Sequence, residues 1–429
     1  LALAFEIPVF PGLKLSRNEQ IIRTITIFNH TKQNNDMDME RYDFDTPVNR
    51  LHTDSMKWDG YSVPGHDLIP LWVADMDFKT APEIIEALAR RATHGVFGYS
   101  FPGDEYYGAV SSWFERRHHW HIDRSWVIPT TGVLPALAAV LRAVTHPGDG
   151  VVVQTPVYNC FFSSIRNAGC RNMDAPLHLD NHGIYQMDFD VLEKALADPK
   201  STAMILCNPH NPGGRVWLAE DLRRVYELCR KYDVTLISDE IHCEIVFAPH
   251  SYTPMATLCD GDCVTMVSPS KAFNLAGLQV ANIIVKDSRL HRIINRAIND
   301  NETCDISPFA IIALQKAYNE GETWLQAMLR YVHANYESVS DYVDQNIPGI
   351  RVLPLEGTYL AWADCREMLG WRGQAVAEFA EALRRDTGVW VQPGTAYGAE
   401  GEGFVRINLA TTRALLAEGM RRIRAYAQE

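Results

Sequence analysis

The middle of the chain alternates short apolar runs with amphipathic stretches. The spacing of apolar residues predicts helices over residues 133–144, 191–197 and 219–232. Between them, apolar runs rich in β-branched residues predict strands at 151–154, 203–207, 234–238, 264–267 and 280–285. Because these runs are apolar on both faces, they fit strands buried inside a parallel sheet. The pattern therefore predicts an α/β fold with a mostly parallel central sheet flanked by helices.

The chain on either side of this region has a different pattern. Helical spacing covers residues 81–94, 104–119, 308–320 and 323–346. Further along, strand patterns at 350–355, 359–364, 389–392 and 404–409 are mixed with a helix at 375–387. We expect residues 1–36 to be an extension of doubtful structure, since the chain begins with Leu1 and Met37 or Met39 would be a natural start. Residues 37–75 are expected to form an N-terminal arm joining a small domain, 76–320 a large domain, and 321–429 a small α+β domain.

Composition and charge exclude several classes of function. The formal charge is −13 with no basic cluster, which argues against nucleic acid as a main partner. No apolar run reaches the roughly 18 residues that a membrane-spanning helix needs, so we expect no membrane partner. The nine cysteines form no regular disulfide framework, which favours reduced thiols and a cytoplasmic location.

Two clusters invite a metal-binding interpretation. Cys259 and Cys263 flank Asp-Gly-Asp without a second pair nearby, and His118, His119 and His121 end a predicted helix. We predict no metal site, because no acidic or cysteine partner sits at helical spacing from the histidines. A helix end at the protein surface is the favoured interpretation of the three histidines.

Ser268-Pro269-Ser270-Lys271-Ala272-Phe273-Asn274 follows the apolar run 264–267. A lysine at the end of such a run can be partly desolvated, which favours its neutral, nucleophilic amine. The alternative is a solvated loop lysine. The neighbouring candidates decide between the two, because each follows a predicted strand, where α/β sheets place their ligands.

Thr131-Gly132-Val133 opens a predicted helix whose first N–H groups suit a phosphate; the alternative is a plain helix cap made by Thr131. Tyr158 follows a strand and offers a face for a flat ring, or is a core tyrosine. Asn211 lies in a tight loop, and Asp239 ends an apolar strand with His242 three residues on. A carboxylate there needs a cationic partner. Arg406 sits inside a strand, where binding a carboxylate would explain it.

Together these motifs resemble the aspartate-aminotransferase superfamily of fold-type I, pyridoxal-phosphate-dependent enzymes, in its cystathionine β-lyase (C–S lyase) branch of the MalY/PatB type. The resemblance runs from about Tyr42 to the C-terminus. It is carried by residues 71–78 (LWVADMDF), 95–99 (GVFGY), 238–242 (SDEIH) and 270–274 (SKAFN).

The resemblance implies a role for each candidate. Lys271 is the catalytic Schiff-base lysine, Asp239 pairs with the pyridine nitrogen, and Tyr158 stacks on the ring. The remaining cofactor-binding residues implied are Gly132, Val133, Leu134, Asn211, His242, Ser268 and Ser270, with Tyr99 contributed by the second subunit of a homodimer. Arg406 binds the substrate α-carboxylate, and Asn211 and Ala74 complete the substrate site.

The implied activity is β-elimination on cystathionine or a related cysteine S-conjugate, giving a thiol, pyruvate and ammonia. Gln279 stands where many aminotransferases of the superfamily carry an arginine, and His242 where they commonly carry a tyrosine. Both departures favour the lyase branch over the first alternative, an aminotransferase of amino acids. A cofactor-bound regulatory binding protein is the second alternative.

Overall fold

The computed structural model describes residues 42–60, 67–300 and 303–428, and a compact unit begins at Phe44. The expected extension 1–36 lies outside the described residues, as do 37–41 and 61–66 of the expected arm. Within the described ranges, no helix is long and apolar enough to cross a membrane.

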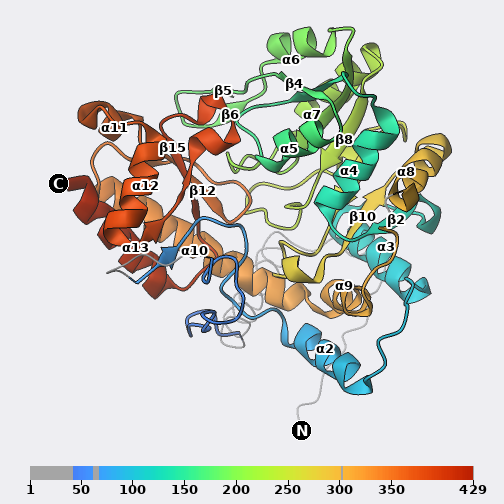
Figure 1. The fold of residues 1–429 in the computed structure, drawn as a ribbon, viewed down its shortest axis with the longest axis horizontal. Helices are drawn as coiled ribbons and strands as arrows, with labels where there is room; N and C mark the ends of the chain where they lie inside the picture. Colours follow the sequence, from blue (N-terminus) through green and yellow to red (C-terminus); the bar gives the residue numbers. More distant parts are fainter. Residues whose placement is uncertain (1–41, 61–66, 301–302, 429) are drawn as a thin grey trace, which may run out of the picture. The chain divides into compact units, whose positions relative to one another are not determined.

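A seven-stranded sheet forms the centre of this unit (Figure 1). Its strands, in spatial order, are β2 (Val127–Thr130), β10 (Ala281–Ile284), β9 (Val264–Val267), β8 (Thr235–Asp239), β7 (Ser201–Cys207), β3 (Gly150–Val153) and β4 (Arg171–Asp174). The five strands from β9 to β4 pair in parallel, whereas β10 is antiparallel to both of its neighbours. This arrangement confirms the predicted α/β fold with a mostly parallel sheet.

Helices cover both faces of the sheet because its strands are apolar on both sides. The helices that follow the strands of the sheet are α4 (Val133–Val144), α5 (Cys160–Asn167), α6 (Phe189–Leu196), α7 (Ala219–Lys231) and α8 (Ser288–Asp300). Val151 and Val153 pack on one face with α4, α5 and α8, while Val152 packs on the other with α6 and α7. This alternation follows from the two-residue period of a strand.

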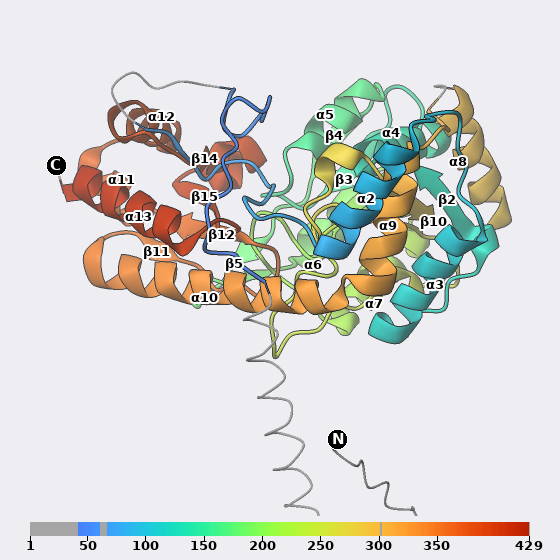
Figure 2. The same cartoon turned by 90° about the horizontal axis from the view of Figure 1, so that it is seen from below.

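Helices α2 (Pro82–His94), α3 (Asp104–His118) and α9 (Pro308–Glu320) pack together beside this sheet. From α9, the long helix α10 (Glu322–Asn346) runs toward the C-terminal part of the chain (Figure 2). Of the short 3-10 turns, η1 (Arg124–Trp126) lies between α3 and β2, η2 (Met255–Thr257) between β8 and β9, and η3 (Ala276–Leu278) between β9 and β10.

A second, antiparallel sheet of four strands lies in the C-terminal part, in the order β11 (Arg351–Val352), β12 (Leu360–Asp364), β15 (Phe404–Asn408) and β14 (Gln392–Pro393). Around it lie α11 (Arg366–Arg372), α12 (Val376–Thr387) and α13 (Arg413–Gln428), and two 3-10 turns, η4 (Gly394–Tyr397) and η5 (Ala399–Gly401). β1 (Ile69–Pro70) pairs in parallel with β13 (Val389–Trp390), which ties the N-terminal segment to the C-terminal part. The pair β5 (His178–Leu179) and β6 (Tyr185–Gln186) forms a separate ribbon.

Two predicted strands have different extents in the structure. The strand expected at 350–355 pairs only at Arg351–Val352, since Pro354 has no N–H to donate. The strand expected at 389–392 is split, because the chain leaves β1 after Trp390 and joins β15 at Gln392. The helix α3 ends at His118, and His119 and His121 are exposed, as expected of a helix end at the surface. His118 itself is only partly exposed, and its Nε2 lies 2.8 Å from Oε1 of the buried Glu244.

Candidate active site

The carboxyl ends of the parallel strands meet at one edge of the large sheet, and a cavity of about 830 Å³, open mouth included, lies there. Cys207 ends β7 and Asp239 ends β8, while the turn after β9 carries Lys271. The predicted site residues that line the cavity are Ala74, Gly132, Val133, Leu134, Tyr158, Asn211, Asp239, His242, Ser270 and Lys271. The structure therefore brings together residues from segments that are far apart in the sequence.

Lys271 is half-buried, and its Nζ donates a hydrogen bond of 2.5 Å to the Ala74 carbonyl. Burial and, next, the positive charge of Arg406 lower the pKa of the Lys271 amine to about 8. Asp75 and Asp239 oppose this shift with their negative charges. A substantial fraction of the amine is therefore neutral near pH 8, the form that attacks carbonyl carbons and accepts protons.

Asp239 and His242 lie on the β8 side of the cavity, and both are buried. Burial raises the pKa of the Asp239 carboxyl to about 7, and Oδ1 accepts a 3.1 Å hydrogen bond from the Ile241 N–H. Burial, followed by the charges of Lys271 and Arg406, lowers the pKa of His242 well below its usual range. His242 is thus a neutral imidazole, and its Nδ1 has no hydrogen-bond partner among the described residues. A cationic ring nitrogen would stabilise the Asp239 carboxylate.

The start of α4 forms a part of the cavity wall that suits an anion. Gly132, with φ of 137°, is the N-cap of α4, and no side chain caps this helix. The interpretation of Thr131 as the cap is therefore wrong, and the uncapped first turn presents N–H groups and the positive end of the helix dipole. Ser270 lines the same cavity, whereas Ser268 does not: its Oγ lies 2.6 Å from the Val280 carbonyl oxygen and 2.8 Å from Ser270 Oγ.

Arg406 does not line the cavity, but it contacts a residue that does. Its Nη1 donates a hydrogen bond of 3.1 Å to Oδ1 of Asn211, which is a lining residue. Its Nη2 donates to the Trp72 carbonyl at 2.8 Å, and its Nε has no partner among the described residues. The guanidinium is thus held beside the cavity, and its Nε–H is among the donors left for a ligand. Tyr158 is half-buried and lines the cavity.

Tyr99 lies away from the cavity and its side chain is fully exposed. Conversely, the sequence analysis missed lining residues that include Cys207, Ile241 and Val280. Cys207 could have been found, since it ends the predicted strand 203–207, and Ile241 could have been found from its place in the motif 238–242. Tyr359, whose hydroxyl donates to the Ala74 carbonyl at 3.0 Å, left no signal in the sequence.

The residues of the cavity fit pyridoxal phosphate. The uncapped end of α4 and Ser270 suit the phosphate, Tyr158 suits the ring face, Asp239 suits a protonated ring nitrogen, and Lys271 suits the aldehyde carbon. The orphaned Nδ1 of the buried His242 provides a further polar group for the ring. Fold and site together define a pyridoxal-phosphate-dependent enzyme.

Comparisons with known proteins agree with this class. The profile of the family described as aminotransferase class I and II matches residues 66–423. Cystathionine beta-lyase PatB of Bacillus subtilis is 38% identical over 387 residues, covering 89% of this chain and 99% of the relative. Protein MalY of Escherichia coli is 34% identical, covering 88% and 97%. The structure of cystalysin from Treponema denticola, which contains pyridoxal 5′-phosphate, has a TM-score of 0.86 at 33% identity, covering 90% of this chain and 99% of that one.

The chain belongs to the aminotransferase class I and II family, whose profile matches most of its length.

The lowered pKa of Lys271 can be measured in cofactor-free protein. We expect the initial rate of borohydride-trapped labelling of Lys271 by pyridoxal 5′-phosphate to rise with pH and level off above about 8. The rise follows the neutral fraction of the amine, which increases as pH passes upward through the pKa. Peptide mass spectrometry quantifies the label, with the exposed Lys194 as reference. A midpoint near 10, that of an ordinary lysine, would contradict the assignment.

Proposed function

We propose that this protein is a pyridoxal-phosphate-dependent C–S β-lyase. It cleaves cystathionine, or a related cysteine S-conjugate, with one water into a thiol (homocysteine from cystathionine), pyruvate and ammonia. The observation that carries the proposal is a single cavity lined by Lys271, Asp239 and the uncapped start of α4. The pKa of the Lys271 amine in this cavity is lowered to about 8. The relative PatB, which is named a cystathionine beta-lyase, supports the substrate class.

Pyridoxal phosphate, when bound, accepts the electron pair that remains on Cα after its proton is removed. Lys271 is the residue placed to take that proton, because its neutral amine is populated near pH 8. Asp239 would keep the ring nitrogen protonated, and Arg406 with Asn211 would bind the substrate α-carboxylate. Cβ then loses its sulfur substituent as a thiolate, and the enamine that is released hydrolyses to pyruvate and ammonia.

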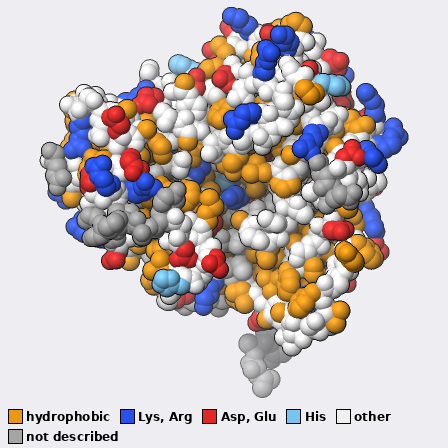
Figure 3. Space-filling model, viewed as in Figure 1, with side chains coloured by type: hydrophobic (Ala, Val, Ile, Leu, Met, Phe, Trp, Pro, Cys, Tyr) orange, Lys and Arg blue, Asp and Glu red, His pale blue; other side chains and the backbone are white. Residues whose placement is uncertain are grey.

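Dimerisation is part of the proposal. Exposed apolar side chains gather over α2 and the chain after it (Figure 3): Ile85, Val96, Phe97, Tyr99 and Phe101. A second copy of the chain would cover this surface and receive Tyr99 at the phosphate end of its cavity. The nine free cysteines support a cytoplasmic location, where thiols stay reduced.

The first test removes the amine. Lys271→Ala should still bind pyridoxal phosphate through the remaining cavity residues. It should produce pyruvate and thiol from L-cystathionine at least about 1,000-fold more slowly, because both the attachment point of the cofactor and the base are lost. Cofactor content is measured by mass spectrometry, and both products are measured on the same sample. Ordinary turnover by this variant would refute the proposed role.

The second test concerns carboxylate binding. Arg406→Lys should raise KM for cystathionine about tenfold or more, because a lysine offers no planar pair of donors. Steady-state kinetics provide the measurement, and Arg385→Lys, on the exposed surface of α12, is the matched control. An unchanged KM in Arg406→Lys would assign the carboxylate to another residue.

The third test concerns the subunit interface. Tyr99→Ala and Lys271→Ala, each weakly active alone, should regain about a quarter of wild-type activity when unfolded together and refolded at equal amounts, because half of the random dimers contain one intact site. Sedimentation checks that the assembly has twice the mass of the chain. Absence of any recovery in verified mixed dimers would show that Tyr99 does not act across an interface.

A further inference from the structure

Residues 71–78 (LWVADMDF) have no regular secondary structure, yet most of them are buried. Their backbone groups are bonded from several directions instead. Asn408 Nδ2 donates to the Val73 and Asp75 carbonyls, at 2.6 Å each, and Asn274 Nδ2 donates to the Met76 and Phe78 carbonyls at 3.0 and 2.9 Å. The segment is thus held by β15 and by the turn that carries Lys271.

One carbonyl of this segment faces the reacting amine. The Ala74 oxygen accepts hydrogen bonds from Lys271 Nζ at 2.5 Å and from the Tyr359 hydroxyl at 3.0 Å. Because a hydrogen bond to a backbone carbonyl depends on where the backbone lies, the position of residue 74 sets where the amine rests.

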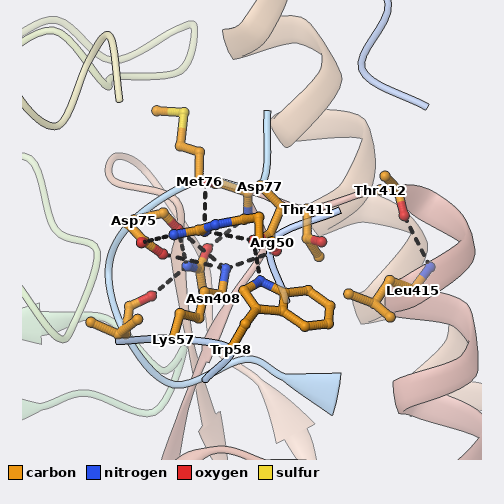
Figure 4. Close-up of polar contacts among 12 residues, drawn as sticks. Arg50, Lys57, Trp58, Asp75, Met76, Asp77, Asn408, Thr411, Thr412 and Leu415 are labelled. Carbon is orange, nitrogen blue, oxygen red and sulfur yellow. Dashed lines mark hydrogen bonds and ion pairs between the residues drawn. The ribbon is translucent and has the colours of Figure 1, made fainter. Parts of the chain in front are cut away.

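The residues that follow Ala74 are fixed by charged groups from 50–58. Lys57, whose side chain is fully buried, has Nζ 2.8 Å from Asp77 Oδ2 and 3.6 Å from Asp75 Oδ1. Arg50 bridges the same two carboxylates, with Nη1 2.8 Å from Asp77 Oδ1 and Nη2 2.7 Å from Asp75 Oδ2. The indole N–H of Trp58 donates to Asp77 at 2.9 Å. Figure 4 shows Arg50 reaching both carboxylates, with the Trp58 indole directed toward Asp77.

This cluster is separate from the cavity, since none of its five residues lines it. A buried lysine and a buried carboxylate cost desolvation free energy, and two hydrophobic residues of similar size would often be at least as stable. Stability alone therefore does not account for two cations converging on two carboxylates directly after Ala74.

We propose that Lys57 and Arg50 are positioning residues that fix the Ala74 carbonyl, through Asp77 and Asp75, as the acceptor for the Lys271 amine. The inference rests on the proposed function, because Lys271 is its reacting group. Neither residue touches the cavity, and each acts through the backbone of residues 74–77.

The test uses Lys57→Met, with Lys57→Arg as the conservative variant. In Lys57→Met, kcat for cystathionine should fall tenfold or more while KM changes less than threefold, and Lys57→Arg should recover part of kcat. In cofactor-free protein, hydrogen–deuterium exchange of peptides covering 71–78 should speed up at least tenfold, with peptides from β7 and β8 unchanged. Arg50→Gln removes the partly exposed cation of the cluster. It should also lower kcat and speed up exchange of residues 71–78, and it replaces Lys57→Met in the test if that variant does not fold.

Arg117→Met is the matched control for lost stability, because Arg117 also pairs with a buried carboxylate, Glu244, at 2.8 Å. It should lower Tm while keeping kcat within twofold and exchange of 71–78 at the wild-type level. Wild-type kcat in folded Lys57→Met, or equal losses of kcat in Arg117→Met, would overturn the proposal. If the wild-type protein releases no pyruvate from cystathionine, the proposed function is wrong. The positioning role is still tested in that case, because an unchanged hydrogen–deuterium exchange rate of residues 71–78 in Lys57→Met would contradict it.

Discussion

A hydrogen bond between the Lys271 amine and the Ala74 carbonyl joins the two parts of the chain that the site requires. The amine comes from the edge of the large sheet, whereas Ala74 belongs to a segment bonded to the small sheet through Asn408. A lysine amine with a lowered pKa needs burial, and a buried amine needs a hydrogen-bond acceptor whenever it carries a proton. The Ala74 carbonyl meets that need without adding a negative charge that would raise the pKa again.

The parallel sheet explains why the remaining groups gather around this bond. Parallel strands end at the same edge, so Cys207, Asp239 and the turn after β9 lie side by side although the chain separates them by about thirty residues each time. The start of α4 lines the same cavity because α4 directly follows β2, which is a strand of the same sheet. The family profile matches residues 66–423, most of the chain, whereas the site residues gather at this one edge of the sheet.

Much of the fold could be predicted because it depends on local pattern. The helix predicted at 133–144 has those bounds in the structure, and the alternation of strands and helices gave the correct class. The antiparallel direction of β10 and the division of 389–392 between two sheets could not be predicted, since both depend on partners distant in sequence. The contact of His118 with the buried Glu244 could not be predicted for the same reason, since the two residues are 126 positions apart.

The candidate site divides in the same way. Asp239, Asn211 and Lys271 could be proposed from their places at strand ends, and the family resemblance supplied roles for them. The cluster of Arg50 and Lys57 around Asp77 gave no signal, because charged residues in a polar stretch are usually solvated and only the folded chain shows that Lys57 is buried. Tyr99 remains a prediction about a second subunit.

The fate of the substrate nitrogen tests the central claim most directly. L-Cystathionine labelled with ¹⁵N on the amino group next to the cleaved C–S bond is supplied to the cofactor-loaded protein, with and without an added 2-oxo acid. The account predicts that the label appears as free ammonium, in equal amount to pyruvate and thiol, whether or not the 2-oxo acid is present. Transfer of the label to an amino acid formed from the 2-oxo acid, without release of thiol, would contradict it and identify the protein as an aminotransferase.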